Sequence, residues 1–213
     1  MALLQLMPHT RQRFITKLLK KQAKLWPVVG LLGPRQSGKS TVVRDLLNLG
    51  EPLSLDDLEC RQEARRSPKA FLARLSKPVL LDEIQKAPEL FDAIKLNVDR
   101  KKIPGSYYLT GSSGFSSKIG IRESLTGRIG ICELLPLMLA ELHVKSFEKQ
   151  KLRFTLDQVA PALETGGMPV PFFLRDPEQR HSYWRSWIET AILRDLAGFF
   201  KRGYDPDFSM ALI

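Results

Sequence analysis

One stretch near the start of the chain constrains its fold more than any other. Residues 33–40 read Gly-Pro-Arg-Gln-Ser-Gly-Lys-Ser and match the pattern G-x-x-x-x-G-K-[ST] at every fixed position. The apolar run 26–32 predicts a buried parallel strand before them, and the apolar spacing of residues 41–47 predicts a helix after them. A strand, a glycine-rich loop and a helix in this order predict a loop that cradles phosphate groups.

The residue types in this loop fit phosphate binding. Gly33 and Gly38 allow backbone conformations that a Cβ atom would obstruct, so that successive N–H groups point toward phosphate oxygens. Lys39 is expected to reach the β- and γ-phosphates of a nucleotide, and the Ser40 hydroxyl to ligate Mg²⁺. The alternative, an incidental glycine turn with a solvated lysine, is disfavoured by the flanking strand and helix. The predicted nucleotide-binding residues are Gly33, Pro34, Arg35, Gln36, Ser37, Gly38, Lys39, Ser40 and Thr41.

A second apolar run ends in the acidic residues that phosphate chemistry needs. Residues 77–85 predict a strand that leads into Asp82 and Glu83. Because open α/β sheets bind ligands at the carboxyl ends of their strands, both motifs are expected at one edge. Asp82 is predicted to hold Mg²⁺ through water, and Glu83 to orient and polarise the attacking water. The alternative, a polar helix start, is disfavoured by the pairing with the loop.

Three further side chains are candidates for the same chemistry. Residues 106–113 predict a short strand, and Thr110 or Ser112 at its exit is placed to contact the γ-phosphate or the attacking water. Ordinary turn chemistry also explains these hydroxyl residues. Arg128 precedes a fifth strand predicted over residues 129–134 and is a candidate arginine finger, which would neutralise charge on the transferred phosphoryl group. The alternative is a salt-bridged surface arginine.

The net charge of +10 is concentrated at the amino terminus. Residues 1–25 carry basic side chains and no acidic one, and Phe14, Ile15, Leu18 and Leu19 share one face of a predicted helix. Three interpretations compete: an arm that faces nucleic acid or a membrane surface, a targeting segment, and a helix packed on the core. The segment has no apolar secretory core and runs directly into the first strand. We favour the packed helix, with weak nucleic-acid binding as the second interpretation.

Composition excludes several other classes of protein. The chain has 213 residues, of which 43% are hydrophobic and 26% charged, and this balance is typical of a globular protein. No apolar run approaches the roughly 18 residues of a membrane span. Cys60 and Cys132 lie at no metal-ligand spacing and are expected to be reduced thiols of a cytoplasmic protein. His9, His143 and His181 stand apart from other ligand residues, so we expect no histidine metal site.

Further motifs follow one another in the order found in one family. They are 82–85 (Asp-Glu-Ile-Gln), 109–113 (Leu-Thr-Gly-Ser-Ser), 124–128 (Ser-Leu-Thr-Gly-Arg), 134–137 (Leu-Leu-Pro-Leu) with 140–142 (Ala-Glu-Leu), and 166–169 (Gly-Gly-Met-Pro). From about Arg13 to Phe200 the chain resembles the bacterial and archaeal AAA-type ATPases. In these proteins the ATPase half precedes a C-terminal domain of uncharacterised function with a restriction-endonuclease-like fold. The resemblance implies an α/β P-loop NTPase with a five-stranded parallel sheet flanked by helices and a small helical lid. It also implies that the strand carrying Thr110 lies between the loop strand and the Asp82 strand.

The resemblance also divides the chain. It implies a basic helix at residues 1–25, an ATPase core at 26–144 and a helical lid at 145–213. Family members are roughly twice as long, so we expect the chain to stop before the family's C-terminal domain. A helix is predicted over residues 155–164. A longer one over residues 177–199 has an apolar stripe of Trp184, Trp187, Ile188, Ile192 and Leu196. On this helix Arg194 is a candidate phosphate contact when the lid closes, and an ion pair with Asp195 or a solvent-facing position is the favoured alternative.

Two classes of function follow from these features. The first is an ATP hydrolase that uses ATP and Mg²⁺ and couples turnover to conformational change or assembly. The second is a nucleotide-gated binding module with little turnover, associated with nucleic acid through its basic surface. A P-loop small-molecule kinase is a weaker third, because it does not need Glu83 directly after Asp82 and no separate acceptor-substrate segment is apparent. Self-association is expected if Arg128 serves a neighbouring copy, as such arginines often do in AAA-type relatives.

Overall fold

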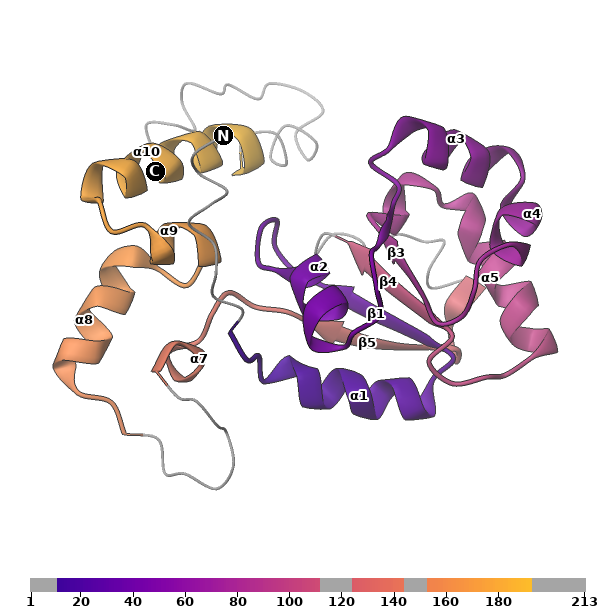
Figure 1. The fold of residues 1–213 in the computed structure, drawn as a ribbon, viewed down its shortest axis with the longest axis horizontal. Coiled ribbons are helices and arrows are strands. Elements are labelled where there is room, and N and C mark those ends of the chain that lie inside the picture. Colours follow the sequence, from indigo (N-terminus) through magenta and orange to yellow (C-terminus); the bar gives the residue numbers. More distant parts are fainter. Residues whose placement is uncertain (1–10, 112–123, 144–152, 193–213) are drawn as a thin grey trace. The chain divides into compact units, whose positions relative to one another are not determined.

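The computed structural model describes residues 11–111, 124–143 and 153–192 (Figure 1). The chain divides into two compact units, Met1–Arg153 and Phe154–Ile213. The first unit contains the phosphate-loop motif and the two acidic residues. Two predicted site residues, Ser112 and Arg194, lie outside the described residues. The same holds for residues 145–152 of a basic link that runs from Lys145 to Arg153 in the sequence.

A five-stranded parallel sheet forms the centre of the first unit. Its order is β2-β3-β4-β1-β5, so β4 lies between the loop strand β1 and the Asp82 strand β3, as the resemblance implied. The predicted α/β class with a five-stranded parallel sheet is confirmed. The strands are β1 (Val28–Leu32), β2 (Leu53–Ser54), β3 (Val79–Asp82), β4 (Tyr107–Gly111) and β5 (Ile129–Glu133).

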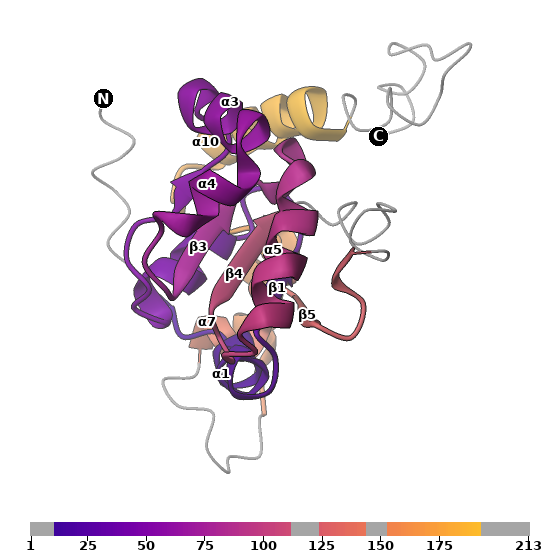
Figure 2. The ribbon, with the colours of Figure 1, turned by 90° about the vertical axis from the view of Figure 1, so that its right-hand side faces the viewer.

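Helices cover both faces of this sheet (Figures 1 and 2). Val28 and Leu32 of β1 pack in the core shared with three helices on one face, and Val29 and Leu31 pack in the core on the other. This alternation arises because successive residues of a strand point to opposite faces of the sheet. On the first face lie α3 (Leu58–Arg66), α4 (Pro68–Ala73) and α5 (Glu89–Arg100), and on the second lie α1 (Ile15–Leu25) and α2 (Lys39–Thr41).

Local signals set the boundaries of the helices on the first face. Asp57 caps α3, since its carboxylate accepts a hydrogen bond from the Cys60 backbone N–H at 2.8 Å. Ser67 separates α3 from α4, and Pro68 occupies the first turn of α4. Proline is tolerated there because that N–H has no intrahelical partner.

The basic amino-terminal helix packs on the sheet, as we favoured. α1 lies against β5 and β1, and its Leu19 side chain is fully buried. The buried stripe is narrower than the sequence predicted, because Leu18 is 43% exposed. Neighbouring residues of a helix point in directions about 100° apart, so Leu18 turns toward solvent while Leu19 packs on the sheet.

The helix after the phosphate loop has an unexpected geometry. α2 spans only Lys39–Thr41, and residues Val42–Leu46 continue it as a π-helical segment. The Leu47 N–H donates to the Val42 carbonyl at 3.2 Å, which closes the wider turn. Val42 and Val43 are both buried, so tertiary packing of two adjacent side chains prevails here over the regular helix that the spacing predicted.

The second unit is helical over its described residues. Its elements are α8 (Leu156–Thr165), α9 (Pro169–Phe173) and α10 (Pro177–Trp187), followed by a π-helical segment at Ile188–Ile192. Two residues of the predicted apolar stripe contact each other on α10: the Trp184 and Trp187 rings meet edge to face, with centroids 5.7 Å apart. Leu196 of the stripe lies outside the described residues. Among the described residues of the chain, no helix is both long and apolar enough to cross a membrane.

Candidate nucleotide-binding site

The two predicted motifs meet at the carboxyl edge of the sheet. The phosphate loop follows Leu32, the last residue of β1, and Asp82 ends β3. Between these strands, Thr110 of β4 lies opposite Leu31 of β1. Since the strands are parallel, their carboxyl ends point to one edge, and this edge is where ligands bind in open α/β sheets.

The backbone of the loop requires its glycines. A Cβ atom on Gly33 would lie 2.2 Å from the carbonyl oxygen of Leu134, a distance that real side chains do not adopt. Gly38 has φ of 93° and ψ of 24°, in the left-handed region that favours glycine. Between them Gln36 also has a positive φ, of 60°. The loop is therefore strained at a non-glycine position, a feature that clusters at ligand-binding sites.

Lys39 lies folded into its own loop. Its side chain is buried, and its Nζ atom donates hydrogen bonds to the carbonyl oxygens of Gly33 at 3.1 Å and Pro34 at 2.8 Å. Burial lowers the pKa of Lys39, while the carboxylates of Glu83 and Asp82 act in the opposite direction. The ammonium group thus lies in the field of both predicted acidic residues.

The rest of the loop surrounds this lysine. The Arg35 guanidinium lies near enough to lower the pKa of Lys39 further. Ser37 is fully buried and its Oγ atom donates to the Pro34 carbonyl at 2.9 Å, which closes the loop on itself. Thr41, at the end of α2, is exposed.

Asp82 and Ser40, the two predicted metal ligands, are in direct contact. The Ser40 Oγ atom donates to Asp82 Oδ2 at 2.9 Å, and the Thr110 hydroxyl donates to Asp82 Oδ1. Hydroxyl and carboxylate oxygens are the donors that Mg²⁺ prefers, and Mg²⁺ bound to nucleotides takes one or two protein ligands together with phosphate oxygens and water. The residues at this edge therefore fit a nucleotide-bound Mg²⁺.

The described residues provide no metal site built from His, Cys, Asp or Glu side chains alone. Within residues 11–111, 124–143 and 153–192, no group of three or more His, Cys, Asp or Glu side chains could hold a metal ion. Any Mg²⁺ at Ser40 and Asp82 would need the nucleotide's phosphate oxygens to complete its coordination.

Thr110 lies beside the two predicted metal ligands and contacts one of them. Its side chain is fully buried, and its hydroxyl is directed at Asp82. The hydroxyl therefore lies next to the predicted Mg²⁺ ligand Asp82, and its contact with the γ-phosphate or the attacking water stays a prediction. The spacing along β4 could not show this, because the contact joins two neighbouring strands.

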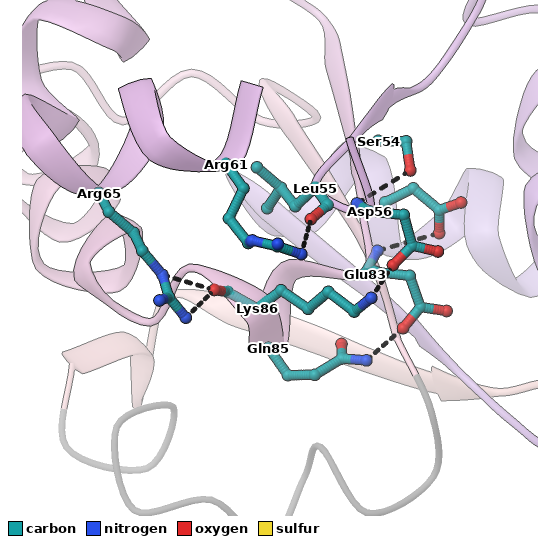
Figure 3. Close-up of polar contacts among 9 residues, drawn as sticks. Ser54, Leu55, Asp56, Arg61, Arg65, Glu83, Gln85 and Lys86 are labelled. Carbon is teal, nitrogen blue, oxygen red and sulfur yellow. Dashed lines mark hydrogen bonds and ion pairs between the residues drawn. The ribbon is translucent and has the colours of Figure 1, made fainter. Parts of the chain in front are cut away.

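Glu83 adopts a backbone conformation that few non-glycine residues take. Its φ is 54° and its ψ is 42°, and it leads into a 3₁₀ turn at Ile84–Lys86. The amide of Gln85 donates a hydrogen bond to Glu83 Oε2 (Figure 3). The left-handed conformation of Glu83 turns its side chain away from that of Asp82. The two adjacent carboxylates therefore occupy different positions.

Side chains of α3 and of the segment after β2 hold this turn in place (Figure 3). Arg65 Nε donates to the Lys86 carbonyl at 2.8 Å, and the Lys86 ammonium forms an ion pair with Asp56. Arg61, one helical turn before Arg65, donates to the Leu55 carbonyl at 3.4 Å. No role was predicted for Gln85 or for these basic residues, although Gln85 stands in the Asp-Glu-Ile-Gln motif.

Arg128 is not brought to the site. Its backbone carbonyl accepts a hydrogen bond from the N–H of Val28, the first residue of β1, so it lies at the amino edge of the sheet. Its guanidinium forms two hydrogen bonds with Asp99, at 2.7 and 3.0 Å, and these raise the pKa of Arg128 and lower that of Asp99. Within one copy of the chain, Arg128 is thus a surface ion-pair partner and cannot reach the phosphate loop beyond the carboxyl edge.

Comparison with known sequences agrees with this geometry. The profile of the family described as "AAA domain" matches residues 26–143, which include the loop and both acidic residues. The chain belongs to the AAA-domain family. Membership in this family, with the geometry above, identifies a nucleotide-binding domain of the ATPase type.

Two curated relatives of this AAA-domain chain come from mycobacteria. They are uncharacterized proteins of Mycobacterium bovis and Mycobacterium tuberculosis, each 33% identical over 174 residues. The aligned region is 80% of this chain but 36% of each relative, so the chain spans little more than a third of their length. The activity of those whole proteins is therefore not carried over to this chain.

Proposed function

We propose that this chain binds ATP and hydrolyses it with the help of Mg²⁺, coupling turnover to conformational change or assembly. The observation that supports the proposal is the cluster at the carboxyl edge, where Ser40 contacts Asp82 beside the buried ammonium of Lys39. The helical second unit is the proposed lid of this nucleotide-binding domain.

Each side chain has a defined task in the proposed reaction. Lys39 exchanges the carbonyls of Gly33 and Pro34 for the β- and γ-phosphate oxygens, and the loop N–H groups bind the same phosphates. Ser40 and Asp82 would hold Mg²⁺, which supplies charge neutralisation and alignment of the phosphates when bound. Glu83 orients a water molecule and accepts its proton as the water oxygen bonds to the γ-phosphorus and the bond to the bridging oxygen breaks.

The second candidate function is a nucleotide-gated binding module that turns over slowly. The contact between Gln85 and Glu83 favours this alternative, because the amide occupies a carboxylate oxygen that would otherwise be open to the attacking water. Both candidates predict ATP binding, and they differ in the rate of hydrolysis. A P-loop small-molecule kinase remains the weaker third proposal.

Replacing Lys39 tests ATP binding, which both candidate functions require. We expect Lys39→Ala to abolish ATP binding without unfolding the domain, since the Lys39 ammonium bonds carbonyls of its own loop, those of Gly33 and Pro34. Calorimetric titration with Mg-ATP measures the affinity, and thermal unfolding checks the fold. Lys101→Ala, at an exposed lysine beyond the end of α5, is the matched control. Equal affinity in Lys39→Ala and parent would show that the phosphates bind elsewhere.

Weak nucleic-acid binding is a second proposed activity, which the surface of α1 supports. This helix has no acidic residue, and its Lys20, Lys21 and Lys24 side chains are exposed. We expect affinity for duplex DNA that is independent of sequence and falls steeply with salt, with a log-log slope of about −0.9 for each phosphate contacted. Fluorescence anisotropy over a salt series measures this slope. The triple variant Lys20→Ala/Lys21→Ala/Lys24→Ala should reduce the magnitude of this slope. An affinity that does not depend on salt would show that these lysines do not contact nucleic acid.

A further inference from the structure

Behind the phosphate loop lies a buried arginine that the catalytic roles do not explain. Arg13 is only 6% exposed, and its guanidinium donates to three separate segments of the chain. Its Nη1 atom bonds the Ser37 carbonyl of the loop at 3.0 Å, and its Nη2 atom bonds the Leu135 carbonyl at 2.6 Å. Its Nε atom bonds Glu141 of α7 (Leu139–His143) at 3.0 Å.

Glu141 is equally buried and fully engaged. It is 3% exposed; its Oε1 atom accepts from the Phe14 N–H at 2.8 Å, and its Oε2 atom accepts from the Met138 N–H at 3.0 Å as well as from Arg13. Burial lowers the pKa of Arg13, and the Glu141 carboxylate opposes that shift. The carboxylate therefore fixes the position of the guanidinium and balances its charge.

The contact with Ser37 determines where the next N–H group points. In a trans peptide unit the carbonyl and the N–H lie in one plane and point in opposite directions. Arg13 holds the Ser37 carbonyl toward the rear of the loop, so the Gly38 N–H on the same peptide faces the front, where phosphates bind. Gly38 makes this orientation possible, since its φ is 93°.

The rest of the loop's rear surface belongs to the same assembly. The Leu134 N–H donates to the Leu32 carbonyl at 2.7 Å, and the Leu134 carbonyl occupies the space that a Cβ atom on Gly33 would need. Leu135, the next residue, binds Arg13. The amino-terminal segment, the residues after β5 and α7 thus all meet behind the loop.

We propose that Arg13 is a positioning residue for the phosphate loop and that Glu141 holds it there. Nucleotide affinity then depends on two segments that do not touch the nucleotide, the chain before α1 and α7 beyond the sheet. The inference rests on the proposed ATP binding and adds to it a requirement located behind the loop.

A purely structural role makes a different prediction. Replacing a buried ion pair by apolar side chains of similar volume is often neutral or stabilising, whereas removing one partner leaves a buried charge unpaired. The double variant Arg13→Met/Glu141→Gln leaves no buried charge unpaired, and the introduced amide keeps an acceptor oxygen beside the backbone N–H groups of Phe14 and Met138. It should therefore recover much of the stability that either single variant loses. It cannot restore the donor to the Ser37 carbonyl, so its ATP affinity should stay low.

The test measures unfolding and Mg-ATP affinity on the same proteins. We expect the double variant to unfold near the parental temperature but to bind Mg-ATP at least about tenfold more weakly, the loss expected for one charge-assisted hydrogen bond. The exposed ion pair between Arg74 and Glu63 supplies the matched control, and Arg74→Met/Glu63→Gln should bind as the parent does.

Each result decides between distinct conclusions. A folded double variant with parental affinity would show that the buried pair serves stability alone. Arg13→Lys extends the test if the double variant does not fold: lysine keeps the charge beside Glu141 but lacks the fork that reaches Ser37 and Leu135 together. A folded Arg13→Lys with parental affinity would likewise overturn the inference. A parent that binds no ATP would overturn the proposed function, and this inference with it.

Discussion

Asp82 and Glu83 are neighbours in sequence, yet the backbone gives them separate surroundings. Asp82 ends β3 and accepts hydrogen bonds from Ser40 and Thr110, whereas Glu83 has a φ of 54° and accepts from Gln85. The first carboxylate accepts hydrogen bonds from two hydroxyl groups, and one of these belongs to Ser40, the other predicted Mg²⁺ ligand. The second accepts a hydrogen bond from a single amide.

Glu83→Gln tests this division at the level of one residue. We expect the variant to bind Mg-ATP normally but to hydrolyse it about 10²–10⁴ times more slowly, because an amide is a far poorer proton acceptor than a carboxylate. Calorimetry measures the binding, and phosphate release under single-turnover conditions measures the rate. Glu59→Gln, at an exposed position of α3, is the control. A Glu83→Gln rate equal to that of the parent would remove Glu83 from the chemistry, and an inactive parent would favour the binding module.

At the scale of elements, the sequence predicted those features whose cause is local. The strand before Gly33 and the strand that leads into Asp82 each depend on a few adjacent apolar residues, and the structure has both. The position of Arg128 at the amino edge could also have been predicted from the sequence. A residue just before a parallel strand lies at the amino edge, opposite the ligand edge.

Other features have causes that no local pattern contains. The Arg13–Glu141 pair joins residues 128 positions apart, and each of them alone reads as an ordinary charged residue of a helix end. The left-handed conformations of Gln36 and Glu83 are imposed by the surrounding fold and run against the preferences of both residue types. The π-helical segment after the loop likewise follows from burial of Val42 and Val43.

The edge strand β5 carries a pH dependence of stability. Burial raises the pKa of Cys132 from 9.0 to about 11. Between these values the unfolded chain loses the thiol proton while the folded chain keeps it, so the free energy of unfolding should fall as pH rises. The slope expected is about 1.4 kcal/mol for each pH unit at most, and below pH 9 the thiol should contribute none.

Denaturant unfolding of parent and Cys132→Ala between pH 8 and about pH 10.5 measures this effect. The difference in unfolding free energy between the two proteins should stay constant up to the unfolded pKa and then shift in favour of the alanine variant. Lysine and tyrosine titrations affect both proteins alike, so they cancel in the difference. A difference that does not change with pH would show that the Cys132 thiol ionises as readily in the folded protein as in the unfolded one.

For the molecule as a whole, the arrangement of the sheet separates Arg128 from the other candidate site residues. Lys39, Ser40 and Asp82 gather at the carboxyl edge, while Arg128 pairs with Asp99 at the amino edge. None of the three neutralises the charge that builds on the γ-phosphoryl oxygens as fully as an arginine finger, which is worth about 10³–10⁵ in rate. If Arg128 is that finger, it must release Asp99 and act on the nucleotide of a neighbouring copy.

We therefore expect hydrolysis per chain to rise with protein concentration, and Arg128→Ala to bind Mg-ATP but hydrolyse it poorly. Mixing Arg128→Ala with Glu83→Gln should restore activity, because one protein keeps the base and the other keeps the arginine. Asp99→Ala is the matched control: it breaks the same ion pair but leaves Arg128 in place, so its activity should survive. The opposite outcome is an equal loss of hydrolysis in Asp99→Ala and Arg128→Ala, no rescue on mixing, and a rate per chain that does not change with concentration. That outcome would show that Arg128 is only the surface partner of Asp99. Rescue by mixing, by contrast, requires a contact between the amino edge of one copy and the carboxyl edge of the next. That contact is heterologous, and it closes into a ring or extends as a filament.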